Sequence, residues 1–231
     1  MRHEVESGPA YSLLNVTLED GEQIQAEGGA MVSHGGNVSM DTNATGGFLR
    51  SLRRSVFGGE SFFQNTFTAT GGDGTVTLAP PLPGDVTHEE LSDETVYVQS
   101  GSYVAGDTRI DVDTEFGGAK TFFGSEGLFL LRVSGSGPLF VSSYGAIKSV
   151  DLSDGETYTL DTGHVVAFDA SADFAVRRVA GLKSTILSGE GLVCRFEGPG
   201  RVWLQTRSPD AFLSWLLPKI PRTTYANDGS P

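Results

Sequence analysis

The chain has 231 residues, of which 38% are hydrophobic, so its length and composition predict a globular protein with a sizeable core rather than a disordered one. Its 29 acidic and 16 basic residues give a formal net charge of −13. A surface this acidic disfavours nucleic-acid binding, which depends on Lys and Arg neutralising phosphates, and no nucleic-acid partner is expected.

Short segments in which hydrophobic and polar residues alternate follow one another along the chain, and each is typical of a β-strand. They are Tyr11–Leu18, Thr75–Ala79, Thr95–Val104, Arg109–Asp113, Leu128–Val133, Leu139–Ser143, Thr157–Leu160, Val165–Asp169, Phe174–Val179 and Arg201–Gln205. Gly- and Asp-rich turns lie between them, such as Asp20-Gly21 and Asp154-Gly155, and supply the positive φ angles that hairpins need. The pattern predicts an all-β fold.

Three sequence elements recur in a constant order. The first is centred on a glycine at Gly29, Gly101 and Gly163; the second carries an acid at Glu60, Glu126 and Glu190; the third begins at Gly74, Gly137 and Gly200. The third elements start 63 residues apart both times (137 − 74 and 200 − 137). A fixed period predicts three tandem β-sandwich repeats, at about 4–90, 91–152 and 153–207, forming one compact unit.

The end of the chain departs from the strand pattern. Ser208 is placed as an N-cap and Pro209 at the first helical position, so a short helix is expected over 208–218. We expect this helix to cover one end of a sandwich, with docking of a partner as the alternative. The polar tail over 219–231 is expected to be disordered.

The first repeat carries an additional basic and apolar segment over 46–57. Its members are Phe48, Leu49, Arg50, Leu52, Arg53, Arg54 and Phe57. Such a segment could insert apolar side chains at a membrane surface while the Arg residues meet headgroups, or it could contact a partner. Alternatively, the apolar side chains pack on the fold and the Arg residues pair with nearby acids.

The recurring acids Glu60, Glu126 and Glu190 could form a ring of carboxylates that binds cations or a basic partner. Their recurrence in every repeat favours a structural role instead, in which each carboxylate accepts hydrogen bonds from turn N–H groups. The glycines Gly29, Gly101 and Gly163 are likewise interpreted as structural turn residues.

We expect no catalytic, metal or cofactor site. His164 follows Asp161-Thr162-Gly163, but the other histidines are scattered and lack metal-ligand spacing. The single cysteine, Cys194, lies in an apolar run typical of a buried thiol. The glycine-rich turns lack the Lys of a phosphate-binding loop.

The sequence also indicates a location. The residues after Met1 contain no apolar leader, and no run approaches the ~18 apolar residues of a membrane span, so a cytoplasmic protein is expected. Acid excess with only four Lys residues favours a salt-rich, halophilic cytoplasm, in which ions screen self-repulsion. An acidic protein from an ordinary cytoplasm is the alternative.

Several of these motifs together resemble the altered-inheritance-of-mitochondria family, number twenty-four in that series. The motifs are Glu27-Gly28-Gly29-Ala30-Met31, Gly58-Gly59-Glu60-Ser61-Phe62-Phe63, Gly124-Ser125-Glu126-Gly127-Leu128, Ser143-Tyr144-Gly145, Asp161-Thr162-Gly163-His164 and Gly189-Glu190-Gly191-Leu192. The resemblance covers roughly residues 4–207 as a single domain. It implies threefold copies of a sandwich of the double-stranded β-helix kind found in the tryptophan RNA-binding attenuation protein. It also implies a homotrimer whose nine units close a pseudo-ninefold ring, and no accepted enzymatic activity.

A ring has an independent physical motive, because stacked open units leave an exposed strand edge at each end, and a head-to-tail interface that closes removes both edges. A capped monomer is the alternative. The function expected from the sequence is a non-enzymatic scaffold or binding protein, with possible peripheral membrane association through residues 46–57. The alternative is a regulatory module that senses an unknown small ligand between repeats.

Overall fold

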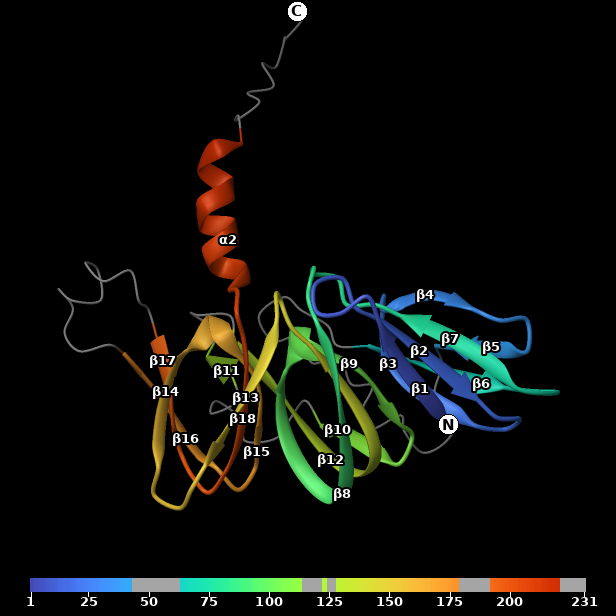
Figure 1. The fold of residues 1–231 in the computed structure, drawn as a ribbon, viewed down its shortest axis with the longest axis horizontal. Helices are drawn as coiled ribbons and strands as arrows, with labels where there is room; N and C mark the ends of the chain where they lie inside the picture. The colour runs from blue at the N-terminus through green and yellow to red at the C-terminus, as the bar shows by residue number, and fades with distance from the viewer. Residues whose placement is uncertain (43–62, 114–121, 124–127, 179–191, 221–231) are drawn as a thin grey trace, which may run out of the picture.

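The computed structural model describes residues 1–42, 63–113, 122–123, 128–178 and 192–220. Among these residues the chain is built almost entirely from β-strands, with one α-helix near the C-terminus (Figure 1). The prediction of an all-β fold is therefore confirmed. A long central sheet runs along the longest axis of the molecule, and a smaller sheet packs against it at each end.

The N-terminal end of the molecule is a four-stranded antiparallel sheet. Its order is β1 (Arg2–Glu6), β2 (Leu13–Leu18), β7 (Gly74–Leu78) and β4 (Met31–His34). The opposite end is a three-stranded sheet in the order β14 (Thr157–Asp161), β17 (Leu192–Glu197) and β16 (Asp173–Arg178).

The central sheet has 11 strands and runs through the whole molecule. Its path is β13 (Ile147–Leu152), β18 (Gly200–Gln205), β15 (Val165–Asp169), β8 (Val86–Gln99), β12 (Leu128–Ser142), β9 (Tyr103–Asp107), β3 (Gln23–Glu27), β6 (Gln64–Ala69) and β5 (Val38–Asp41). The two remaining strands, β10 (Ile110–Asp113) and β11 (Phe122–Phe123), pair with β12.

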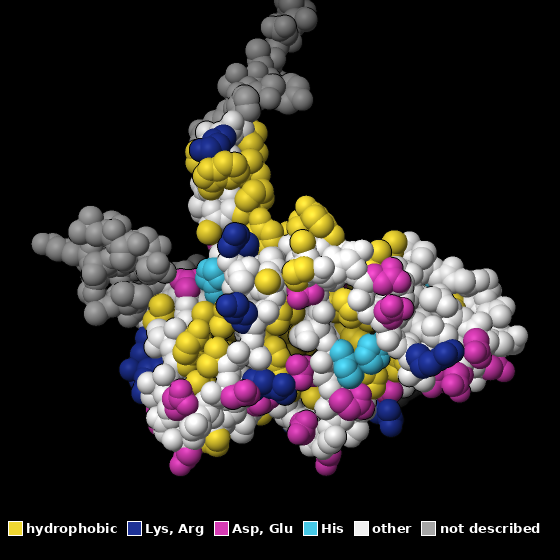
Figure 2. Space-filling view, in the orientation of Figure 1, with side chains coloured by type: hydrophobic (Ala, Val, Ile, Leu, Met, Phe, Trp, Pro, Cys, Tyr) yellow, Lys and Arg dark blue, Asp and Glu magenta, His cyan; other side chains and the backbone are white. Residues whose placement is uncertain are grey.

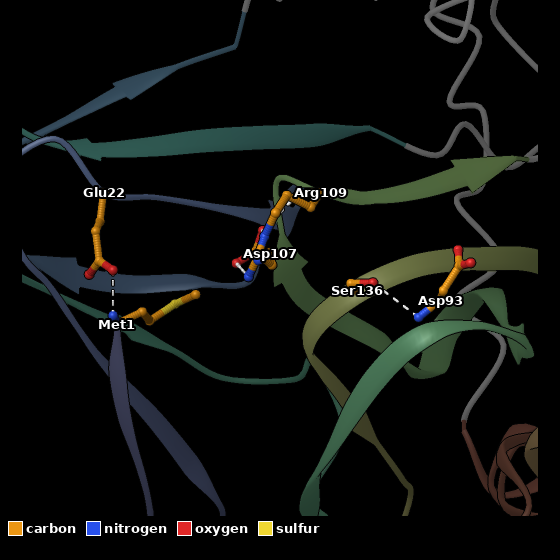
Figure 3. Close-up of polar contacts among 6 residues, drawn as sticks. All are labelled: Met1, Glu22, Asp93, Asp107, Arg109 and Ser136. Atoms are coloured by element: carbon orange, nitrogen blue, oxygen red, sulfur yellow. Dashed lines mark hydrogen bonds and ion pairs between the residues drawn. The ribbon is translucent and has the colours of Figure 1, made fainter.

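The long strands β8 and β12 hold the two halves of the central sheet together. The register shifts between Gly135 and Ser136, and Asp93 opposite has a positive φ of 62°. The backbone N–H of Asp93 donates to the hydroxyl of Ser136 at 3.0 Å (Figure 3). A Cβ on Gly135 would lie 2.3 Å from the carbonyl oxygen of Arg109, so only glycine fits this irregularity.

This irregularity corrects one sequence prediction. The segments Leu128–Val133 and Leu139–Ser143 were expected as separate strands across a turn at Gly135-Ser136-Gly137. They belong to one strand, because the glycines form a bulge within the ladder instead of reversing the chain.

The opposite correction applies to Thr95–Val104, expected as a single strand. The 3-10 turn η1 (Ser100–Ser102) interrupts it, so β8 ends at Gln99 and β9 begins at Tyr103. An equivalent turn, η3 (Thr162–His164), lies between β14 and β15. The polar residues of these short turns continue the alternation of a strand, so the period-two pattern cannot reveal the break.

Three clusters of buried hydrophobic side chains lie along the molecule. Core 1 packs β2 and β7 of the N-terminal sheet against β3 and β6 of the central sheet, around Phe67. Core 2 lies around β8, β9 and β12 and includes Leu131 and Trp203. Core 3 lies between β15 and β18 on one side and the C-terminal sheet on the other, around Phe168 and Phe196. Each core is therefore built around at least one large buried aromatic side chain.

Candidate functional site

The structure places the three predicted turn glycines at the start of three similar strands. Gly101 lies in η1 before β9 and Gly163 in η3 before β15, and the residues flanking both turns have nearly the same extended backbone angles. Gly29 lies in the turn before β4 with φ of 96°, where a side chain would be strained. All three glycines therefore lie at strand starts.

Other predicted residues cannot be placed. Glu60, Glu126 and Glu190 lie outside the described residues, as does the whole 46–57 segment. The proposed contact residues Phe48, Leu49, Arg50, Leu52, Arg53, Arg54 and Phe57 therefore have no structural test, and membrane association through them stays a prediction. In the described part of the chain, no helix is long and apolar enough to cross a membrane.

His164 has hydrogen bonds that suit a structural role. Its Nδ1 atom lies 2.7 Å from the carbonyl oxygen of Gln205. The Gln205 side chain, which is buried, donates to the carbonyl of Gly163 and accepts from the N–H of Tyr144. This network fastens the η3 turn to the end of β18. Among the described residues there is no group of three His, Cys, Asp or Glu side chains that could hold a metal ion.

Cys194 lies within core 3, as the sequence predicted for a buried thiol. Burial raises the pKa of the Cys194 thiol to about 12, so almost none of it is the nucleophilic thiolate at neutral pH.

Strand β4 forms one of the two edges of the N-terminal sheet, and β1 forms the other. Strand β4 pairs with β7 on one side, and no described strand pairs with its other side. The corresponding strands β9 and β15 each have partners on both sides, β12 and β3 for the first, β18 and β8 for the second. An unpaired edge presents N–H and C=O groups that can accept another strand.

The β4 edge also exposes apolar side chains. Each of β4, β9 and β15 carries a one-residue bulge against its partner, at Val32, Val104 and Val166. Val104 and Val166 are 1% and 0% exposed, whereas Val32 is 56% exposed. The same side chain in the same local geometry is thus buried twice and left open at the end of the molecule.

Strand β14 forms the exposed edge at the other end (Figure 1). It pairs with β17, and no described strand lies on its other side. Its counterparts are β3, which pairs with β9 as well as β6, and the end of β8, which pairs with β15 as well as β12. Strands β4 and β14 therefore each leave one side without a described partner strand, at opposite ends of the molecule.

Core 3 beside this edge differs from the other two cores in the described part of the chain. Core 1 contains Val104, which lies on β9, and core 2 contains Val166, which lies on β15. Core 3 receives no such valine from the described chain. Around it lie apolar side chains that are only partly buried: Tyr97, Val150, Tyr158, Leu160, Phe174 and Val176.

A polar cleft of about 420 Å³ lies where the turn before β3 meets the turn between β9 and β10. Its charged groups are already paired, the amino group of Met1 with Glu22 and the guanidinium of Arg109 with Asp107 (Figure 3). The hydrogen bond from the amino group lowers the pKa of Glu22, and the bond from Arg109 lowers the pKa of Asp107. An acid and a base on each wall could hold a small zwitterionic or polar molecule.

The C-terminal helix α2 (Pro209–Leu216) stands off the sheets (Figure 1). The Ser208 hydroxyl accepts from the Ala211 N–H at 3.3 Å, and Pro209 occupies the first turn. None of its residues is buried, so it does not cover the end of a sandwich as the sequence suggested. Figure 2 shows hydrophobic side chains over much of its visible surface.

Comparison with known proteins relates these features to a family. A curated protein of Streptococcus pyogenes serotype M6, named as uncharacterized, is 30% identical over 97% of this chain and 93% of its own length. A crystal structure of a Streptococcus pyogenes protein from a structural genomics consortium matches with a TM-score of 0.78 and 30% identity, over 95% of this chain and 99% of that one. The family model described as Mitochondrial biogenesis AIM24 matches residues 3–207. The chain therefore belongs to the AIM24 family, as its repeated motifs indicated.

Proposed function

We propose that this protein is a non-enzymatic scaffold whose copies join head to tail, with β4 of one copy pairing with β14 of the next. The observation that supports this most is the pair of unpaired edges at opposite ends. Because the two edges differ, each copy can use both at once, and a ring closes when the rotation between copies permits it. A homotrimer is the assembly expected from the resemblance described above.

The register of the new pair follows from the two internal ones. In the internal pairs, Ala105 lies opposite Ala26 and Ala167 lies opposite Val98. Each of these alanines is the fourth residue after the turn glycine. Ser33 is likewise the fourth residue after Gly29. Leu160 precedes Asp161, the residue before η3, as Val98 precedes Gln99, the residue before η1. Ser33 of one copy would therefore lie opposite Leu160 of the next. The joined strands would then run β2-β7-β4-β14-β17-β16, which repeats the internal order β13-β18-β15-β8-β12-β10.

Packing gives the interface an energetic motive. In the proposed register, Val32 would enter core 3 of the neighbouring copy, as Val104 enters core 1 and Val166 enters core 2. Burying one valine is worth roughly 1.5–3 kcal/mol, and the half-buried Tyr158 and Leu160 would lose further contact with water. The apolar contact offsets the repulsion between copies of a chain with net charge −13.

The shared bulge also supports the interpretation of the chain as three tandem repeats. Val32, Val104 and Val166 lie at the third position after Gly29, Gly101 and Gly163. In this interpretation each internal junction has the same strand pairing as the proposed junction between copies. Three copies would then supply nine units to the pseudo-ninefold ring.

The molar mass of the protein in high salt, measured by light scattering, tests the proposal. We expect three times the chain mass of 24.4 kDa for the wild type and a single chain for Val32→Asp, because a carboxylate cannot enter core 3 unpaired. Met40→Asp is the matched control, since Met40 is an exposed apolar side chain on β5, which pairs with β6 in the central sheet and takes no part in the proposed β4–β14 pair. A wild type that remains a single chain, or a Val32→Asp variant that remains a trimer, would refute the proposed interface.

The polar cleft supports a second candidate function, the sensing of a small ligand between units. Glu22 and Asp107 come from neighbouring units, so a ligand that replaces the pairing of Met1 and Arg109 would couple binding to the junction. A screen of zwitterionic metabolites by thermal shift tests this, since a ligand that prefers the folded state raises the melting temperature. Loss of the shift in Arg109→Ala would locate the ligand in the cleft, and an unchanged shift would exclude the cleft.

A further inference from the structure

We infer that the apolar face of α2 docks into a groove on the neighbouring copy, lined by Tyr11, Leu13, Leu82 and the prolines around it. This inference rests on the head-to-tail assembly proposed above. It adds an interaction surface to the strand pairing and names the occupant of both the helix and the groove as a second copy of this chain.

The helix and the residues just after it carry apolar side chains that the described part of the chain leaves exposed. In α2, Trp215 is 58% exposed, and Phe212 and Leu213 are also exposed. Beyond α2, Leu217 is 60% exposed, and Ile220 is exposed as well. The Phe212 ring lies 6.1 Å from that of Tyr144 in an edge-to-face arrangement. Exposed apolar residues gathered on one helix mark an interaction site rather than scattered surface hydrophobics.

The groove is the apolar counterpart of this helix. It has a volume of about 290 Å³ and its lining contains no charged side chain. Tyr11 is 72% exposed and Leu82 also faces solvent, while Pro80, Pro81 and Pro83 form a rigid wall. Three prolines and an aromatic ring offer contact area that needs little ordering on binding.

The order of the connecting segments places the two surfaces together. Four segments lie side by side on the side of the molecule from which α2 projects (Figure 1): residues 10–12, 83–85, 144–146 and 206–208. The N–H of Ser12 donates to the carbonyl of Gly84, and the N–H of Asp85 donates to the carbonyl of Gly145, both at 3.0 Å. The N–H of Arg207 donates to the carbonyl of Tyr144 at 3.2 Å. Each segment therefore lies beside the next in chain order.

This order continues into the next copy. Residues 10–12 lead directly into β2, residues 83–85 into β8 and residues 144–146 into β13. Residues 206–208 lead into α2 instead, and in a head-to-tail assembly the corresponding strand is β2 of the neighbour. Because β2 begins at Leu13, the neighbour's Tyr11 and Ser12 come beside the root of α2. The helix then lies between Tyr144 of its own copy and Tyr11 of the next.

Chemical cross-linking tests the docking directly. The double variant Leu82→Cys/Leu217→Cys is treated with a short bismaleimide, and products are separated on a denaturing gel. The native Cys194 does not interfere because it is buried. We expect covalent products of two and three chains. The control Leu82→Cys/Asp154→Cys uses an exposed residue in the turn after β13, at the opposite end of the strands, and should give products of one chain.

A third substitution measures the contribution of the helix. Adding Trp215→Glu to the cross-linking variant should lower the yield of linked chains by about tenfold, a typical loss when a buried aromatic anchor is removed from an interface. Trp215 is exposed in the single chain, so this change leaves the fold intact. An unchanged yield would overturn the docking of the apolar face.

The outcomes separate this inference from the assembly on which it rests. A trimeric mass with no links above the control overturns the helix docking and leaves the strand pairing intact. A mass of one chain refutes both. Links within one chain only would assign the helix to another surface and overturn the inference. The inference would also be overturned if no cross-link forms and the wild type floats with phosphatidylcholine and phosphatidylglycerol vesicles, while Trp215→Glu does not.

Discussion

The junctions inside the chain and the two ends of the molecule present the same strands in different surroundings. At the internal junctions, β9 pairs with β3 and β15 pairs with β8, and Val104 and Val166 are buried in cores 1 and 2. At the ends, β4 and β14 each have one edge that no described strand covers, and Val32 is exposed. The difference lies in what the chain places beside each edge rather than in the local structure of the strands. This contrast is the basis for our proposal that the two ends bind another copy.

The largest expected effect on stability comes from placing an aspartate at Val104 rather than at Val32. Val104→Asp should destabilise the fold by roughly 4 kcal/mol or more, because it buries an unpaired carboxylate in core 1. Val32→Asp should change the stability of the single chain by less than about 0.5 kcal/mol, since the side chain there faces water. Urea unfolding of dilute protein, in which copies are separate, measures both. Equal destabilisation by the two substitutions would show that the two positions are not equivalent in the way the comparison requires.

A smaller effect is expected at the second internal junction. The Trp203 indole N–H donates to Glu89 at 3.0 Å, and Arg201 pairs with the other Glu89 oxygen at 3.1 Å while its guanidinium lies over the Trp203 ring. Glu89→Ala should therefore cost about 2 kcal/mol of unfolding free energy. The neighbouring Glu90→Ala is the control and should cost less than about 0.5 kcal/mol, since Glu90 is exposed and forms an exposed ion pair with His88. Similar losses in both variants would deny Glu89 its role in joining β8 to β18.

The smallest expected effect is a pH dependence at the first junction. The His3 ring on β1 lies 4.2 Å from that of His88 and 5.0 Å from that of Phe140, with Glu90 nearby. Burial, followed by the neighbouring His88, lowers the pKa of His3 below 6.5. The unfolded chain thus binds a proton more readily, so this contribution is complete above about pH 6.5 and is lost as the pH falls toward the folded pKa.

Melting temperatures from pH 7.5 down to 5 in the wild type and in His3→Phe measure this dependence. We expect the wild type to lose more stability than the variant over this range, because phenylalanine keeps the ring contact with Phe140 and carries no proton. A steeper loss in the variant would contradict the assignment.

Much of the fold follows from the sequence. Alternating segments such as Thr157–Leu160 and Val165–Asp169 lie in β14 and β15, and the turns at Asp20-Gly21 and Asp154-Gly155 lie between strands as predicted. The family could be identified because several motifs occur together over most of the chain. Strands β1 and β5 were not anticipated, since they are short and largely exposed and so lack a clear alternation of buried and exposed positions.

The candidate site could not be derived from the sequence in the same way. Met31-Val32-Ser33 resembles the starts of β9 and β15, and no local pattern reveals that β4, of these three strands, has no second described neighbour. Which strand covers an edge depends on the path of the whole chain. The sequence interpretation anticipated exposed end strands in general terms, and in the structure β4 and β14 are among the strands with one side unpaired by described residues.

Amide hydrogen exchange of the two end strands tests the central claim most directly. In the wild-type protein at assembling concentration, we expect peptides covering β4 and β14 to be protected as strongly as those covering β9 and β15. Val32→Asp should remove the protection of β4 and β14 together and leave β9 and β15 unchanged. Fast exchange of both end strands in the wild type, or protection that survives Val32→Asp, would contradict the pairing of copies through these edges.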